Sequence, residues 1–376
     1  MTATSAVTSA EVGFGRLEPL VDSFDAAVEA PSAIEERDFR LAGGAVRFRS
    51  PHPEMLRRLC RAFAHLELAD PAPTPDLVVN LWDSASGSPA PPLPHTGDEK
   101  APGAFFYFSN EVLRAGFQLG TSGDARVLEV YRQAPTPALS VLERGAARAW
   151  YWVADADRIP YWEEATPLVY LLDWWLRERD MYLLHAGAIG TSAGGVVLVG
   201  KSGSGKSTTA LSSLDSDLVY AGDDYVGVSL GPQPEVHSFY SSGKLMQNHV
   251  DRLPFLLDAL ANRERLDAEK AVVYVNERWP ERMSPGFPLR AVVAPRVTPG
   301  LAGARVLEAS PAEAFKALAP STVFQMHTRG QDSLMRARRL LERVPSYVLE
   351  VGSDIPSIPR AIADLVETLA DDAPTR

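Results

Sequence analysis

The chain of 376 residues lacks features that several protein classes require. It has one cysteine, Cys60, which excludes an internal disulfide framework and a thiolate metal cluster. Its formal net charge is −11, so no general positive field favours nucleic acid or anionic lipid. Any binding of phosphate must therefore come from a local site.

Long apolar runs are missing as well. No segment offers the roughly 20 apolar residues that a membrane-spanning helix needs, and the N-terminus lacks the basic start and apolar run of a signal peptide. We therefore expect a cytoplasmic protein without a membrane or nucleic-acid partner. Cys60 shares one helical face with Leu56, Leu59 and Phe63, which predicts a core cysteine rather than a reactive thiol.

Three regions of different pattern follow one another along the chain. Residues 1–37 have weak periodicity and predict a loosely ordered arm. Residues 38–158 contain closely spaced strand-like runs and one clear helix, which predicts a mostly β (α+β) domain; within it, the Ser-, Pro- and Gly-rich residues 84–103 predict an exposed loop. Residues 159–376 alternate strands and helices, which predicts an α/β domain with a mixed sheet.

Two helices of this α/β domain are predicted from apolar spacing. In "EATPLVYLLDWWLRERD", Thr166 is suited to the N-cap and Pro167 to the first helical position, where no N–H is needed. The run "VDRLPFLLDALANRERL", residues 250–266, is also expected to be helical.

A glycine-rich loop near the middle of the chain matches a known phosphate-binding pattern. "GKSGSGKS", residues 200–207, fits G-x-x-x-x-G-K-[ST] without a mismatch, between a strand-like run and a helix-like run. Glycines let successive backbone N–H groups face a phosphate, and the following helix directs its positive end at the same anion. Lys206 is suited to the β- and γ-phosphates and Ser207 to Mg²⁺. The residues predicted to bind nucleotide are Gly200, Ser202, Gly203, Ser204, Gly205, Lys206, Ser207 and Thr208.

An acidic pair and a histidine flank this loop in the sequence. Asp223 and Asp224 end the strand-like run "DLVYAGDD" directly after the loop's helix, which places them near the γ-phosphate. In kinases one such carboxylate organises Mg²⁺ while another accepts the proton of the acceptor hydroxyl. His185 precedes the loop in "YLLHAGAI"; alone it would more often be a core residue, but its position favours a role in the site.

These motifs distinguish among the classes of phosphate-loop protein. The chain lacks the LSGGQ-type segment of ABC ATPases and the NKxD motif of GTPases. The stretch "LLHAGAIGTSAGGVVLVGKSGSGKSTTALSSL…LVYAGDDYVGV" instead resembles the catalytic domain of the bacterial HPr kinase/phosphorylase family. The close resemblance covers residues 181–228. It implies a P-loop kinase domain of the HPr kinase/phosphoenolpyruvate carboxykinase type, with ATP and Mg²⁺ bound.

The same resemblance implies a role for each candidate residue. Lys206 and Ser207 hold phosphates and Mg²⁺, Asp223 is the metal-side carboxylate, Asp224 the base, and His185 orients that base. Which aspartate has which role stays open.

The chain also departs from that family. The glycine-rich signature loop that true HPr kinases carry after the acidic pair is absent, and the N-terminal region does not match theirs. We therefore expect an HPr-kinase-related enzyme that transfers the γ-phosphate of ATP to a Ser/Thr-type hydroxyl of a peptide, protein or small metabolite, peptide natural-product pathways being one setting. The acceptor, reverse phosphorolysis and the oligomeric state, a homo-oligomer included, stay open.

Two alternatives remain at this point. One is a small-molecule kinase of the shikimate or nucleoside-monophosphate type, for which the arginine-rich segment 336–343 would be a lid. The other is a non-catalytic, ATP-sensing, peptide-binding module. A second Gly-Lys pair in "SSGKL" lacks the rest of the loop pattern, and contact of Lys244 with phosphate or substrate stays open.

Overall fold

The computed structural model describes residues 18–29, 34–91, 104–106, 113–120, 127–133, 137–322 and 330–371. Most of the expected arm and residues 92–103 of the expected loop lie outside these ranges. None of the described helices has both the length and the apolar character that a membrane crossing requires. The protein is a mixed α/β chain that divides into two compact units: Met1–Asp38, Gly44–Arg58 and Ala69–Pro160 in the first, and Phe39–Gly43, Leu59–Leu68 and Tyr161–Arg376 in the second.

The first unit is built on an eight-stranded sheet in the order β1-β2-β3-β8-β7-β6-β5-β4. The strands from β4 to β8 form an antiparallel series, whereas β2 and β8 both pair parallel to β3. The strands are β1 (Glu35–Leu41), β2 (Gly44–Ser50), β3 (Leu77–Asp83), β4 (Ala104–Phe106), β5 (Leu113–Gly120), β6 (Val127–Gln133), β7 (Ala138–Glu143) and β8 (Arg148–Val153).

A helix, α1 (Glu18–Glu29), lies within the stretch for which the sequence predicted only a loose arm. Leu20, Phe24 and Ala27 are buried, at the spacing that puts them on one helical face. Phe24 meets the ring of Trp82 edge-on, with centroids 5.6 Å apart. Burial of this apolar face explains why the segment is helical despite its weak overall periodicity.

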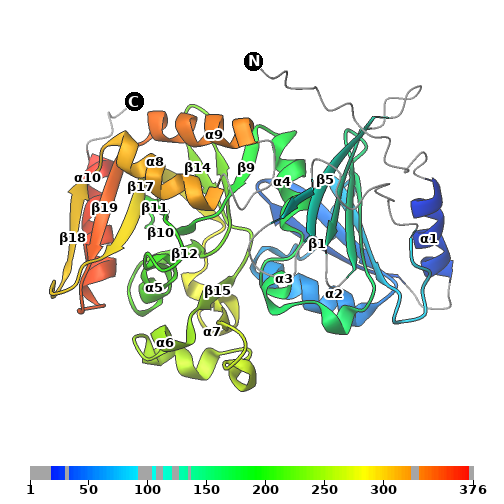
Figure 1. Ribbon diagram of the computed structural model, residues 1–376, viewed down its shortest axis with the longest axis horizontal. Helices are drawn as coiled ribbons and strands as arrows, with labels where there is room; N and C mark the ends of the chain where they lie inside the picture. The colour runs from blue at the N-terminus through cyan, green and yellow to red at the C-terminus, as the bar shows by residue number, and fades with distance from the viewer. Residues whose placement is uncertain are drawn as a thin grey trace, which may run out of the picture. The chain divides into compact units, whose positions relative to one another are not determined.

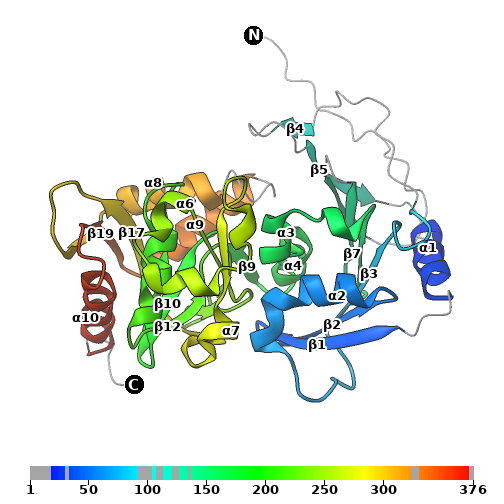
Figure 2. The ribbon, with the colours of Figure 1, turned by 90° about the horizontal axis from the view of Figure 1, so that it is seen from below.

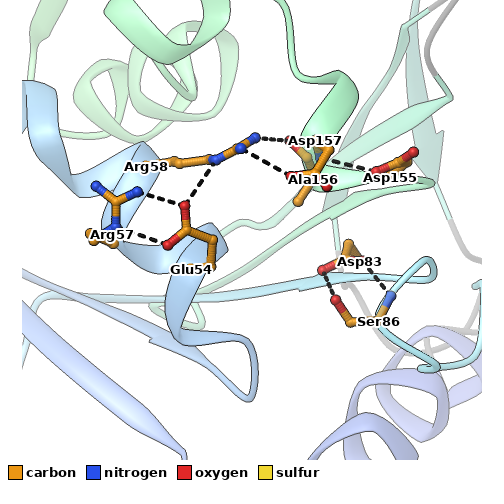
Figure 3. A network of polar contacts seen from close by, with 8 residues as sticks. All are labelled: Glu54, Arg57, Arg58, Asp83, Ser86, Asp155, Ala156 and Asp157. Carbon is orange, nitrogen blue, oxygen red and sulfur yellow. Dashed lines mark hydrogen bonds and ion pairs between the residues drawn. The ribbon is translucent and has the colours of Figure 1, made fainter.

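Exposed ion pairs tie the helix α2 (Pro53–Cys60) to the short 3-10 helix η2 (Ala156–Arg158) (Figure 3). The Arg58 guanidinium lies 2.9 Å from the Asp157 carboxylate and donates to the Ala156 carbonyl at 2.8 Å. Glu54 pairs with both Arg57 and Arg58 on α2. Because exposed pairs stabilise little, this network adds little to the free energy of folding.

The second unit contains a nine-stranded mixed sheet. Its order is β12-β10-β11-β17-β14-β13-β9, with β19 also paired to β17 and β18 to β19. A separate two-stranded sheet pairs β15 with β16. The strands are β9 (Met181–Leu184), β10 (Gly187–Thr191), β11 (Gly194–Leu198), β12 (Val219–Gly222), β13 (Val226–Ser229), β14 (Glu235–His237), β15 (Ser242–Leu245), β16 (Ala271–Tyr274), β17 (Gly286–Val297), β18 (Ala304–Glu308) and β19 (Ser346–Val351).

Helices cover both faces of this sheet (Figures 1 and 2). One apolar cluster joins α5 and α10 to the sheet, and a second joins α8 and α9 to its other face. The helices of the second unit, with its 3-10 segments, are η1 (Arg61–Leu66), α3 (Tyr161–Ala165), α4 (Val169–Arg177), α5 (Lys206–Ser212), η3 (Ser213–Asp215), α6 (Gln247–Val250), η4 (Pro254–Ala259), η5 (Arg263–Arg265), α7 (Val275–Arg278), η6 (Pro280–Arg282), α8 (Pro311–Thr322), α9 (Gly330–Arg343) and α10 (Ser357–Asp371).

Two helix predictions were wrong in detail. Helix α4 begins at Val169, and Thr166 donates its hydroxyl to the Trp162 carbonyl at 2.9 Å instead of capping α4. Residues 250–266 form the short segments η4 and η5 rather than one helix. Pro254, which lacks the N–H that a helix continuing from Val250 would need, is the first residue of η4.

Part of the segment around Cys60 belongs to the second unit. Cys60 is buried, as predicted. The Phe63 ring packs against Tyr240 with centroids 5.2 Å apart, and Nε2 of His65 lies 2.7 Å from the Ser238 hydroxyl. These contacts explain why Leu59–Leu68 groups with the later part of the chain.

Candidate functional site

The predicted site residues follow strands that end at one edge of the sheet. Strand β10 is antiparallel to both β11 and β12, so β11 and β12 run in the same direction. The loop at residues 200–207 follows β11, and the acidic pair follows β12. Because strands that run in the same direction end at the same edge, the two motifs emerge at one edge of the sheet, with β10 between their strands.

The loop after β11 curls as the sequence predicted. Gly200, Gly203 and Gly205 have φ angles of 149°, 80° and 102°, a region that favours glycine. Lys206 begins α5, and its Nζ donates to the Gly200 carbonyl across the loop. The Lys206 side chain therefore lies across the loop, from its last residues back to its first glycine.

A small cavity of about 130 Å³ opens beside this loop. Its lining brings together residues of the loop, the acidic pair, the strand β15 and the segment after it. The lining residues are His185, Lys201, Ser202, Gly203, Gly205, Lys206, Ser207, Thr208, Asp224, Lys244, Leu245, Met246, His249 and Lys270. Four of these are lysines, so the cavity is suited to a polyanion.

Burial changes the acid–base behaviour of the loop lysine. Burial lowers the pKa of Lys206, and the nearby Lys270 charge adds to this effect. The carboxylates of Asp223 and Asp224 act in the opposite direction. An incoming phosphate would supply further negative charge at this point and favour the ammonium form.

Strand register brings His185 to the acidic pair. Leu184 at the end of β9 is paired with Val226 at the start of β13, so the residue after Leu184 lies beside the residues before Val226. Nε2 of His185 lies 3.0 Å from Oδ1 of Asp224, and its ring centroid is 5.0 Å from that of Tyr225.

The protonation of His185 follows from its surroundings. Burial lowers the pKa of His185, against the effect of the Asp224 carboxylate. The ring is therefore neutral near pH 7, and the tautomer with hydrogen on Nε2 is the one that donates to Asp224. His185 can orient this carboxylate without adding a charge.

Lys244 belongs to the site, although the sequence motifs alone did not decide whether it does. Its Nζ forms an ion pair with Oδ2 of Asp224 and lies 3.4 Å from the Thr166 hydroxyl. Gly243, just before it, passes so close to α5 that an added Cβ would lie 2.5 Å from Cδ2 of Leu211. The missing side chain at Gly243 thus allows β15 to approach and deliver Lys244.

Asp224 is held in its charged form. Burial acts to raise the pKa of Asp224, but the Lys244 ammonium and the His185 hydrogen bond outweigh it and hold that pKa well below its usual range. Its side chain is 25% exposed, so it can still meet a molecule in the cavity.

Asp223 is placed differently from its neighbour. It is buried and is not part of the cavity lining, and its Oδ2 accepts the backbone N–H of Lys244 at 3.0 Å. Burial raises the pKa of Asp223 to about 6, and the Asp224 charge adds to this, while the Ser207 side chain beside it acts in the opposite direction.

Oδ1 of Asp223 is enclosed without a hydrogen-bond partner among the described residues. A carboxylate oxygen in this state, next to the Ser207 hydroxyl, is a donor set that suits Mg²⁺. Among the described residues no group of three or more His, Cys, Asp or Glu side chains forms a metal centre of another kind.

The predicted residues therefore lie in three places. His185, Ser202, Gly203, Gly205, Lys206, Ser207, Thr208 and Asp224 line one cavity. Gly200 and Ser204 face a second hollow on the other side of the loop, and Asp223 lies behind the lining.

The arginines of α9 do not reach this cavity. Arg338 pairs with Glu342, Arg339 lies 3.8 Å from Asp180, and Arg343 donates to the Gly231 carbonyl. The sequence left contact of Lys244 with phosphate open and did not single out His249, because each comes from a segment that only folding brings to the loop.

Comparisons with known proteins add little beyond a distant likeness. No protein-family model matches the chain, and no curated protein matches it. Among solved structures the chain is similar to the structure of the Hpr(Ser) kinase/phosphatase from Coxiella burnetii, with 11% sequence identity and a TM-score of 0.25. That match covers 50% of this chain and 94% of that chain.

Proposed function

We propose that the chain is an ATP-dependent kinase that transfers the γ-phosphate to an alcohol group, as in the HPr-kinase-related enzymes that its loop and acidic pair resemble. The observation that carries this proposal is the meeting of Lys206, Ser207 and Asp224 around one cavity. A phosphate cradle supplies one half of a phosphoryl transfer, and a carboxylate held in its charged form supplies the other.

In this proposal the loop holds the phosphates. Backbone N–H groups between Gly200 and Ser207 surround the β-phosphate, and Lys206 exchanges its bond with the Gly200 carbonyl for the β- and γ-phosphate oxygens. Lys244 and Lys270, at the same cavity, face the charge of the γ-phosphate.

Ser207 and Asp223 would hold Mg²⁺. The free Oδ1 of Asp223 and the neighbouring hydroxyl are the groups suited to it. When bound, Mg²⁺ neutralises phosphate charge that builds up as the terminal bond breaks.

Asp224 would receive the acceptor hydroxyl as a hydrogen-bond donor. The bond between the γ-phosphorus and the oxygen that bridges it to the β-phosphate breaks, a bond to the acceptor oxygen forms, the proton passes to Asp224, and ADP leaves. The low pKa of Asp224 makes it a weak base. This suits a loose transition state, in which the hydroxyl is positioned more than it is deprotonated. His185 is a positioning residue that fixes the carboxylate.

The test is transfer of label from γ-labelled ATP. The purified chain would be incubated with peptide, protein and small-molecule fractions of a cell extract, with Mg²⁺ present. We expect a labelled acceptor with the unmodified chain and none with Asp224→Asn, which should still bind ATP in calorimetry. Asp217→Asn is the matched control, since Asp217 is fully exposed and outside the cavity lining.

Two results would count against the proposal. Label transfer that Asp224→Asn leaves intact would remove Asp224 from the reaction. Slow ADP release that no fraction stimulates, and that Asp224→Asn does not change, would instead favour the non-catalytic ATP-sensing module.

A further inference from the structure

One wall of the cavity beside the glycine-rich loop comes from the open end of the small sheet of β15 and β16. Leu245 at the end of β15 is paired with Ala271 at the start of β16. Met246 and Lys270 are the next residues beyond this pair, and His249 follows on α6. All three line the cavity, and Met246 is half exposed, so this wall reaches the surface.

Lys270 is held at this wall through its backbone and not through its charge. The buried Asn262 side chain donates to the Lys270 carbonyl at 2.8 Å and accepts the backbone N–H of Val272 at 2.9 Å. Oε2 of Glu269, the neighbouring carboxylate in the chain, accepts from Asn262 and lies 3.3 Å from Nε of Arg265. Among the described residues no carboxylate pairs with the Lys270 ammonium, so its charge is available to a bound molecule.

Lys270 differs in this respect from two other lysines of the cavity. The Lys206 side chain belongs to the phosphate loop, and the Lys244 ammonium pairs with Asp224. The Lys270 charge acts to lower the pKa of Lys206, so the two ammonium groups face one space. An ammonium has three N–H donors, so Lys270 can meet the γ-phosphate and a second anion together. A half-buried cation without a counter-charge favours such an anion.

The acceptor is the molecule that is placed to supply this anion. In the proposed function its hydroxyl lies at Asp224, and the phosphates lie on the loop side of the cavity. The chain runs from Lys244, which pairs with Asp224, to Met246 at the surface. An acceptor that enters along this wall therefore has its remaining groups next to Met246, His249 and Lys270.

We propose that the acceptor carries a negatively charged group, a carboxylate or a phosphate, a few bonds from its hydroxyl, and that Lys270 and His249 bind this group. The Lys270 ammonium supplies the charge, and an imidazole N–H of His249 supplies a second donor. Met246 offers an apolar contact to the carbon chain between the hydroxyl and the anion. The inference rests on the proposed function in placing the acceptor hydroxyl at Asp224.

The experiment measures the binding of small anionic alcohols beside that of a neutral one. Glycerate, glycerol phosphate and glycerol share a three-carbon chain, and each is titrated into the chain with the loop already filled by Mg²⁺ and a non-hydrolysable ATP analogue. The ring-proton NMR signals of His249, assigned with His249→Gln, report binding at this wall. Calorimetry measures the affinity for the ATP analogue.

Three variants accompany the unmodified chain. Lys270→Met removes the charge, and Lys270→Arg keeps it. Lys316→Met is the matched control, because it removes one positive charge at an exposed residue outside the cavity lining.

We expect glycerate or glycerol phosphate to shift the His249 signals in a saturable way, and glycerol to leave them unchanged at the same concentration. Lys270→Met should weaken binding of the anion by about tenfold or more, whereas Lys270→Arg and the control should keep it. The anion that binds more tightly identifies the charged group as carboxylate or phosphate. Glycerol binding as tightly as both anions, no saturable shift with either anion, or undiminished anion binding in Lys270→Met would overturn the inference.

Affinity for the ATP analogue should change little in Lys270→Met. A loss of analogue affinity as large as the loss of anion affinity would assign Lys270 to the nucleotide phosphates and would also overturn the inference.

This outcome is separate from that of the proposed function, since no phosphoryl transfer is measured. Anion binding that depends on Lys270, in a chain that labels no acceptor, would keep the anion site and remove the kinase. Label transfer that needs Asp224, to an uncharged acceptor and at an unchanged rate in Lys270→Met, would do the reverse.

Discussion

Nε2 of His185 lies 3.0 Å from Oδ1 of Asp224, although 39 positions separate the two residues in the chain. The neutral imidazole donates to a carboxylate that also pairs with Lys244. His185 therefore fixes the direction of the carboxylate oxygens and, together with Lys244, helps to keep the carboxylate charged.

We expect His185→Ala to lower the rate of label transfer by about 10- to 100-fold, a usual cost for the loss of a positioning partner. His185→Gln, which keeps an N–H donor, should restore part of the rate, and neither should change ATP affinity much. The measurement is label transfer at saturating ATP beside calorimetry. An equal loss of transfer rate in His185→Ala and His185→Gln would show that the hydrogen bond from His185 to Asp224 does not support the transfer.

The ion pair between Lys244 and Asp224 predicts a stability effect that depends on both partners. Lys244→Met should lower the free energy of unfolding by about 3 kcal/mol, because a largely buried carboxylate loses its counter-charge. The double variant with Asp224→Asn should recover most of this loss. Urea unfolding of the two single variants and the double variant tests it; losses that simply add would contradict the pairing.

Asp223→Asn separates the binding of metal from that of nucleotide. Because an amide is a weaker Mg²⁺ ligand than a carboxylate, ATP affinity with Mg²⁺ should fall by about tenfold or more. Affinity in EDTA should stay the same or rise, since negative charge near the phosphates is removed. Calorimetry under both conditions measures the difference. A similar loss in EDTA would assign Asp223 a structural role instead.

Gly200→Ala tests the loop itself. Gly200 has φ 149°, and an added Cβ would lie 2.5 Å from the Ser204 hydroxyl oxygen. The strain, on the order of 1–2 kcal/mol, should open the loop and weaken ATP and tripolyphosphate alike. Gly231→Ala is the control, since its nearest neighbouring atom is 3.9 Å away. Preserved tripolyphosphate affinity in Gly200→Ala would contradict a loop that grips phosphate.

His65 predicts how stability depends on pH. Burial lowers the pKa of His65 to about 3, whereas a histidine in the unfolded chain has its ordinary pKa of 6.5. Between these two pH values the unfolded chain binds a proton at His65 and the folded protein does not. The contribution of His65 to the free energy of unfolding is therefore fully present above pH 6.5. It should fall by about 1.4 kcal/mol for each pH unit between pH 6.5 and pH 3. His65→Gln, which can still reach the Ser238 hydroxyl, should flatten this part of the profile.

Urea unfolding between pH 5 and 8 measures the effect. His249→Gln is the control, because His249 is only partly buried and the same slope should remain. An unchanged slope in His65→Gln would place the acid sensitivity elsewhere.

The local sequence pattern was enough to predict much of the secondary structure of the second unit. The apolar β-branched run before the loop forms β11, the run after the loop forms α5, and the acidic pair follows β12. Pattern failed at residues 250–266, where a proline interrupts helical spacing, and at α1, where tertiary burial of Phe24 outweighs weak periodicity. The roles of the site residues, by contrast, stay predictions until the variants above are measured.

The sequence by itself determined the phosphate loop and the strand–loop–helix around it, because glycine conformations and side-chain periodicity are local properties. Only the tertiary structure decided that Lys244 meets Asp224 and that β17 and α8 form a hollow behind the loop. Those contacts depend on strand order and on the close approach of β15 to α5 at Gly243, and neither is encoded within a short stretch of chain.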